Sequence, residues 1–232
     1  MTRLLAAGVI GPPVFALVSL VLGATRTAYD PVRTFLSQLS LNGGGGWQVA
    51  NLVAVGVSIL ASGFGLRRVV TAGPASLWGS RWVRLAGLGF VGIGVFRDDP
   101  WLSYPPGAPS GIGPPRSRHG AVHLLSSAVA GSGLWFAMLT FLRRFAAERD
   151  TAWIGYTVAS ASLFPGFYAA ALASGLASAD PANPLGGRAG LFQRLSVFTA
   201  LAWIAALACR SLRMRPADGR GGVPTPSRTG TD

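Results

Sequence analysis

The chain has 232 residues, of which 50% are hydrophobic and only 12% are charged, and its mean hydropathy is +0.44. A soluble domain carries about 25% charged residues, so this composition excludes an ordinary soluble protein and indicates a membrane protein. The net charge of +12 comes from 20 arginines, which lie at the ends of apolar stretches; we therefore attribute it to membrane topology and exclude nucleic acid as a partner.

Six stretches without Asp, Glu, Lys or Arg follow one another along the chain. They are Leu4–Thr25, Thr34–Leu66, Leu85–Phe96, His119–Leu142, Thr151–Ala179 and Leu195–Cys209. About 20 helical residues cross a bilayer, and lipid requires every backbone polar group to be satisfied internally. We therefore predict an all-α fold, a polytopic transmembrane helical bundle of six spans. Residues 1–210 form this single domain, and residues 211–232 are expected to be a disordered cytoplasmic tail.

The arginines also predict the orientation of the bundle. Six spans place both termini on one side. If that side is the cytoplasm, thirteen arginines lie inside and seven lie outside, as the positive-inside rule requires. We expect a multi-pass protein of the plasma membrane with cytoplasmic N and C termini. The use of Arg without Lys, with abundant Ala and Gly, is typical of a bacterial protein.

The connection between the first two spans contains a short amphipathic pattern. Phe35, Leu36 and Leu39 fall at helical spacing, and Ser37 and Ser40 fall on the other side. The pattern predicts a short helix that lies flat at the outer membrane interface.

Glycines recur in the third span at positions 87, 89, 92 and 94. Small residues let the backbones of neighbouring membrane helices approach closely. We therefore expect these glycines to serve helix packing.

Titratable residues gather where the third span ends and the fourth begins. Asp98 and Asp99 follow the third span, and His119 and His123 open the fourth, one helical turn apart. An antiparallel hairpin brings the four together. Two histidines with carboxylates are possible ligands of a divalent metal, and a His–Asp pair can act as a base or proton relay. A third possibility is that Asp98 merely pairs at the interface and fixes the hairpin.

The two short spans place further charges at the outer membrane edge. To cover the bilayer, the sixth helix must begin near Leu191, which draws Arg194 inward, and the short third span draws in Arg97 and Asp98. Ionisable groups at such depth are normally paired, so we expect an Asp98–Arg194 or an Asp99–Arg97 pair. The candidate polar site comprises Ser37, Ser40, Arg97, Asp98, Asp99, His119, His123 and Arg194.

Short motifs along the chain resemble a known family. They are Ser37-Gln-Leu-Ser40, Asn51, Phe96-Arg-Asp-Asp99 and His119-Gly-Ala-Val-His123. In this order they resemble the DUF998 family, bacterial and archaeal six-span membrane proteins of uncharacterised function, over roughly residues 5–210. The resemblance implies a helical bundle and implies no reaction. A more distant likeness is to the membrane hydrolases that include alkaline ceramidases. Those enzymes use a Ser, an Asp and three histidines around zinc, whereas this chain has two histidines.

These patterns favour an integral membrane protein whose extracytoplasmic polar patch binds a lipid headgroup, a small solute or a partner. One alternative is a metal-dependent membrane hydrolase that uses His119, His123 and Asp98 or Asp99. Another is a structural or accessory membrane subunit. The middles of the spans are almost entirely Ala, Leu, Val and Gly, which argues against an ion path. The sequence names no cofactor and does not decide whether the protein is an enzyme.

Overall fold

The computed structural model describes residues 2–73 and 75–214. In this part of the chain the α-helices are α1 (Thr2–Thr25), α2 (Gly46–Val69), α3 (Ser80–Val95), α4 (Arg118–Ala147), α5 (Thr151–Ala177) and α6 (Ala189–Arg213). A 3₁₀ helix, η1 (Leu36–Ser40), follows α1, and a π-helical turn, η2 (Ala75–Gly79), leads directly into α3. The predicted all-α fold is confirmed.

Five of these helices are long and apolar enough to cross a membrane by themselves. The exception is α3, which has 16 residues. Because η2 precedes it without a break, the chain is helical from Ala75 to Val95, roughly the length that a span needs. The expected short third span is therefore present, and the protein is a multi-pass membrane protein built from a six-helix bundle.

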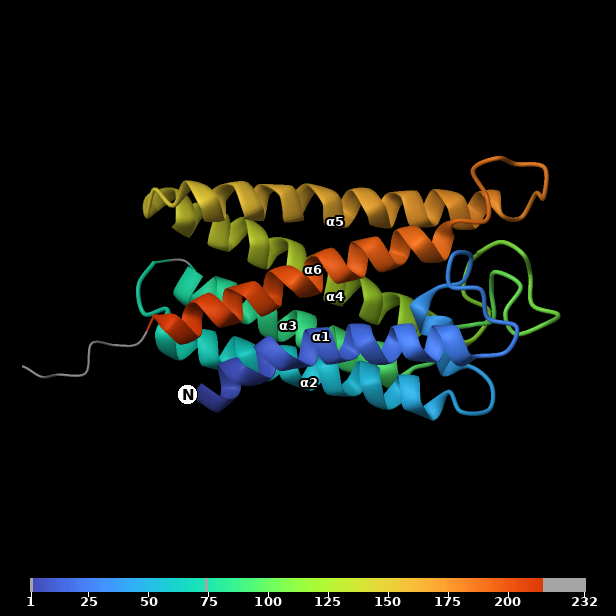
Figure 1. The fold of residues 1–232 in the computed structure, drawn as a ribbon, viewed down its shortest axis with the longest axis horizontal. Coiled ribbons are helices and arrows are strands. Elements are labelled where there is room, and N and C mark those ends of the chain that lie inside the picture. Colours follow the sequence, from blue (N-terminus) through green and yellow to red (C-terminus); the bar gives the residue numbers. More distant parts are fainter. Residues whose placement is uncertain (1, 74, 215–232) are drawn as a thin grey trace, which may run out of the picture.

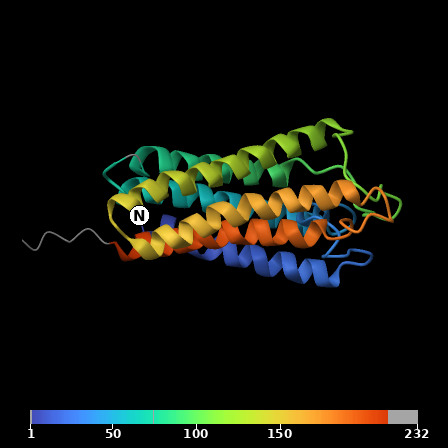
Figure 2. The same cartoon turned by 90° about the horizontal axis from the view of Figure 1, so that it is seen from above.

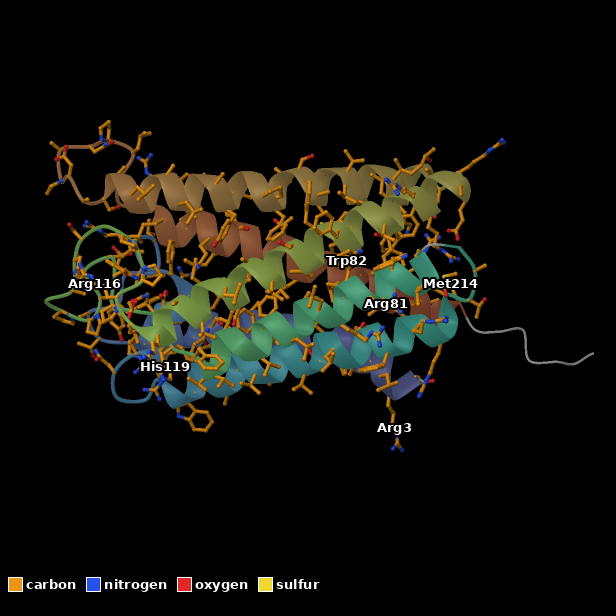
Figure 3. The ribbon with its side chains drawn as sticks, turned by 180° about the vertical axis from the view of Figure 1, so that it is seen from behind. Arg3, Arg81, Trp82, Arg116, His119 and Met214 are labelled. Carbon is orange, nitrogen blue, oxygen red and sulfur yellow. The ribbon has the colours of Figure 1, made fainter. Side chains whose placement is uncertain are left out.

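The helices follow one another around the bundle in chain order. Each packs against its neighbours in sequence, and α1 also packs against α6 (Figures 1 and 2). The start of α1 and the end of α6 lie at the same end of the bundle (Figure 1). The three long connections, 26–45, 96–117 and 178–188, lie at the opposite end, which we call the loop end. Arg116 and His119 lie at the loop end, far from Arg3, Arg81 and Met214 (Figure 3).

Glycines hold α3 tightly between its neighbours. A Cβ atom added to Gly87 would lie 2.6 Å from the backbone nitrogen of Leu60 and 2.7 Å from the carbonyl oxygen of Gly56, both in α2. On the opposite side of α3, a Cβ at Gly89 would lie 2.5 Å from the backbone nitrogen of Ala130 in α4. These approaches are possible because glycine has no side chain. The packing role predicted for the glycines of this span is confirmed.

One hydrogen bond between α4 and α5 uses a carbonyl group that a proline leaves without a partner in its own helix. Pro165 in α5 has no N–H, so the carbonyl of Ala161 loses its usual partner within the helix. The indole nitrogen of Trp135 in α4 donates a hydrogen bond to this carbonyl, at 3.0 Å. The two helices converge toward their short connection and diverge toward the loop end (Figures 1 and 2).

The segment predicted as an interfacial helix has a different structure. It forms the five-residue 3₁₀ helix η1, and all five of its residues are buried. Its first backbone N–H, at Leu36, donates to the side-chain oxygen of Gln193 in α6, at 2.7 Å. The prediction of a helix lying flat on the membrane was wrong, because partners from other helices draw this segment into the end of the bundle.

At the other end of the chain, α6 continues to Arg213, three residues beyond the predicted end of the membrane domain. Residues 215–232 of the predicted tail lie outside the described residues.

Candidate functional site

The carboxylate of Asp98 is the centre of a polar network at the loop end. Asp98 follows the end of α3, and 15% of its side-chain surface is accessible. Its Oδ2 accepts hydrogen bonds from Ser37 Oγ at 3.1 Å and from Gln38 Nε2 at 2.9 Å. Its Oδ1 accepts one from the backbone N–H of Asp99, at 2.9 Å. η1 therefore supplies the donors that hold this carboxylate in place.

Burial raises the pKa of the Asp98 carboxyl group above its ordinary value of 3.8. The nearby His123 and the hydrogen bonds from Ser37 and Gln38 act in the opposite direction and do not overcome the burial. This carboxyl group therefore loses its proton at a higher pH than an exposed aspartate does.

His123 lies beside Asp98 on the inner face of α4. Its Nδ1 lies 2.8 Å from the carbonyl oxygen of Phe96. Because a carbonyl oxygen can only accept, Nδ1 carries the proton. Its Nε2 then faces Asp98 Oδ2 at 3.8 Å, which is too far for a direct hydrogen bond. The Phe96 carbonyl thus fixes the tautomer and aims Nε2 at the carboxylate.

Asp99 has a different environment from that of Asp98. Its Oδ2 accepts hydrogen bonds from the backbone N–H groups of Arg116, at 2.7 Å, and Ser117, at 3.2 Å. Burial opposes ionisation of Asp99, but hydrogen bonds from Ser117 and Arg116 outweigh it and lower the pKa of this carboxyl group. A side chain at Gly120 would collide with the Asp99 carboxylate. Asp99 therefore ties the 96–117 connection to the start of α4.

A small polar pocket opens beside this network. Its volume is about 100 Å³, and its lining includes Ser37, Asp98 and His123 together with Ser127, Tyr168 and Gln193 from α4, α5 and α6.

A much larger apolar hollow, of about 560 Å³, continues from the polar pocket along the bundle. The two share lining residues, among them Ser37, His123, Tyr168 and Gln193. Deeper in the bundle the lining of the hollow is mostly apolar, and its volume lies in the range of 300–1,000 Å³ that is usual for small-molecule sites. The polar pocket and the apolar hollow therefore adjoin, and side chains such as those of His123 and Tyr168 contribute to the lining of both.

The apolar hollow is covered unevenly. Buried residues of α1, α2 and α3, such as Phe15, Leu52 and Phe90, line its inner side. Along α4 and α5 the lining includes exposed apolar residues, such as Leu124 and Leu172. Since these helices cross the membrane, the hollow faces lipid where α4 and α5 diverge.

Arg194 is buried in a separate cluster. Its guanidinium donates hydrogen bonds to the carbonyl oxygens of Pro31, at 2.5 Å, and Thr34, at 2.9 Å, and to the hydroxyl group of Tyr29. Burial raises the pKa of Tyr29 to about 12, although the nearby Arg194 lowers it. The predicted Asp98–Arg194 pair was wrong, because carbonyl groups of the 26–35 segment reach Arg194 and donors from η1 reach Asp98.

A sequence comparison decides the family. The model of the family described as "Protein of unknown function (DUF998)" matches residues 9–210. The chain belongs to the DUF998 family. No curated protein and no solved structure with which the chain was compared matches it.

In this DUF998 protein three of the predicted site residues come together, namely Ser37, Asp98 and His123. Asp99 is adjacent but is turned toward the backbone of the 96–117 connection. Ser40 donates to the carbonyl oxygen of Ser37, within η1, at 2.7 Å.

Two other predicted residues lie outside the network. Arg97 is exposed, and no ion pair joins it to Asp99 among the described residues. His119 is also exposed, and its ring lies beside that of Phe96, with 5.7 Å between the ring centroids. The predicted Asp99–Arg97 pair was therefore wrong, and the two histidines do not converge on one point.

The described residues contain no group of three His, Cys, Asp or Glu side chains placed to hold a metal ion. Asp98 and His123 approach each other, but a third such ligand does not. The donor set thus does not fit a zinc site, which uses three or four ligands.

The predicted site residues did not include Gln38 and Gln193, which take part in the polar network and the pocket beside it. Gln38 lies inside the Ser37-Gln-Leu-Ser40 motif, and Gln193 precedes Arg194 at the edge of the sixth span. Polar amides in otherwise apolar stretches are the signal that could have identified both. Tyr168 has a comparable signal, since it interrupts the Ala-rich second half of α5.

Proposed function

We propose that this protein binds an amphiphilic molecule, with its polar head at the Asp98–His123 network and its apolar chain in the hollow between α4 and α5. The observation that carries the proposal is that the polar pocket and the apolar hollow adjoin and share lining residues. A site with one titratable end and a long apolar remainder is complementary to a lipid-like molecule.

The opening toward lipid gives the route of entry. An amphiphile dissolved in one leaflet can move sideways between α4 and α5 without leaving the apolar phase. Its head then stays level with the loop end, where Asp98 and His123 lie. The arginine distribution supports placing this end on the extracytoplasmic side of the plasma membrane, with both termini in the cytoplasm.

Gly131 in α4 offers a matched test. It lines the apolar hollow, and a Cβ atom added there would meet only the ring of Phe164, at 3.7 Å. Gly131→Ala therefore leaves the hollow open, whereas Gly131→Leu fills part of it. We expect mass spectrometry of organic extracts to detect an amphiphile with purified wild type and Gly131→Ala, and at least tenfold less of it with Gly131→Leu. Equal amounts with all three proteins would contradict the proposal.

A further inference from the structure

Nε2 of His123 and Oδ2 of Asp98 face each other where the polar pocket meets the apolar hollow. Since Nδ1 of His123 donates to Phe96, Nε2 of the neutral ring carries a lone pair. That lone pair faces Oδ2 of Asp98 across 3.8 Å. Carboxylate and lone pair repel each other unless a proton or a donor group comes between them. The spacing allows a donor from a bound molecule to reach both atoms.

The arginines near the polar pocket are engaged by other partners. No arginine of the described residues lines the polar pocket or the apolar hollow. Arg116 lies over the ring of Trp101, with its guanidinium carbon 4.6 Å from the ring centroid. Arg194 is occupied by carbonyl oxygens and Tyr29. Phosphate and carboxylate groups are bound by arginine and by clustered backbone N–H groups, so an anionic head would meet the Asp98 carboxylate without an arginine to compensate its charge.

The other polar groups of the pocket include neutral donors. The backbone N–H of Leu36 donates to the side chain of Gln193, so the atom it contacts is the amide oxygen. The amide nitrogen of Gln193 remains available to donate. The phenol of Tyr168 lines the same pocket. A ligand oxygen can accept from these groups while its own hydrogen is donated toward Asp98 or His123.

We infer that the head group of the ligand is a hydroxyl or a primary ammonium group, and not a phosphate or a carboxylate. An ammonium group donates to both Asp98 and His123, and its positive charge complements the buried carboxylate. A hydroxyl group donates to one of these atoms and accepts from Gln193. This inference rests on the proposed amphiphile site and specifies its ligand class.

The test uses probes that share one dodecyl chain and differ in the head. Full-length protein in lipid nanodiscs is equilibrated with radiolabelled dodecylamine at pH 7, and the same protein with Gly131→Leu gives the background of lipid partitioning. Dodecanol, dodecyltrimethylammonium and dodecyl phosphate then compete for the specific signal. We expect dodecylamine itself and dodecanol to compete at least tenfold better than dodecyl phosphate. Dodecyltrimethylammonium, which has no N–H, should compete less well than dodecylamine.

The head series needs no variant at Asp98, so it gives an answer even if Asp98→Asn fails to fold. Where Asp98→Asn does fold, it should weaken dodecylamine binding at least tenfold, about 1.4 kcal/mol. Specific binding of all four probes with equal affinity would overturn the inference about the head and leave the amphiphile site standing. Identical binding to wild type and Gly131→Leu for every probe would overturn the proposed function itself.

Discussion

The approach of α2 and α3 predicts a large effect of a single methyl group. Replacing Gly87 by Ala puts a Cβ atom 2.6 Å from the backbone nitrogen of Leu60 and 2.7 Å from the carbonyl oxygen of Gly56. Ordinary van der Waals contact begins at 3.4 Å. Both colliding atoms belong to the backbone of a helix, so no side chain can rotate away. The two helices must move apart by roughly 0.8 Å at this point.

The cost follows from overpacking. Inserting a methyl group into a tight contact costs about 1–3 kcal/mol, and a collision with backbone atoms lies in the upper part of this range, at about 2–3 kcal/mol. The better helix propensity of alanine returns about 1 kcal/mol. The net loss of about 1–2 kcal/mol corresponds to a fall of roughly 2–8 °C in the midpoint of thermal unfolding. Separation of α2 and α3 also displaces the end of α3, and Asp98 follows that end directly.

Gly155→Ala is the matched control. Gly155 lies inside α5, and a Cβ atom there has nothing within 4 Å. This change should add up to about 1 kcal/mol to the free energy of unfolding, so the midpoint should stay unchanged or rise. Both variants are heated in the same detergent. Fluorescence-detected size-exclusion chromatography then measures the fraction of protein that is still monodisperse at each temperature, and the midpoint is the temperature at which half remains. Equal midpoints for Gly87→Ala and Gly155→Ala would refute the close-packing account of α3.

Two further predictions concern α4–α5 and Asp98. Trp135→Phe removes the donor to the Ala161 carbonyl and should lower the free energy of unfolding by about 1–3 kcal/mol. In a Pro165→Ala background the helix regains its own N–H donor to this carbonyl, so the same change should cost at least about 1 kcal/mol less. Additive effects of the two changes in a thermal double-mutant cycle would disprove the role of the proline. For Asp98, the raised pKa means that the folded state binds the proton more tightly than the unfolded state. The contribution of Asp98 to stability should therefore be largest below about pH 3.8 and be lost as pH rises through the raised pKa of the folded protein. The pH dependence of the wild-type midpoint minus that of Asp98→Asn isolates this contribution, and identical pH dependences would show that this carboxyl group is not responsible.

The sequence predicted most of the bundle because the bilayer imposes strong rules on it. Uncharged stretches of sufficient length must be helices in lipid, and the glycines of α3 have few roles there other than close packing. The hairpin between α3 and α4 also brought Asp98 and His123 together, as their positions at facing helix ends predict.

The partners of the buried charges could not be predicted in the same way. Arg194 reaches carbonyl oxygens of the 26–35 segment, and their positions depend on how that irregular segment folds. η1 was mistaken for an interfacial helix because its apolar spacing is the same whether it covers lipid or enters the bundle. The lining of the apolar hollow includes residues of α4 and α5, which diverge toward the loop end (Figure 2), and small residues such as Gly131 and Ala169. A cavity between helices leaves no local pattern in the sequence from which it could be predicted.

The central claim is that one amphiphile lies between α4 and α5 with its head at Asp98. A structure of wild-type protein purified with native membrane lipid tests it most directly. We predict elongated density along Leu172 and Phe164, ending in a head within hydrogen-bonding distance of Asp98 or His123. A hollow closed by α5 packing against α4 along its whole length, or bilayer lipid with its head away from Asp98, would contradict the account.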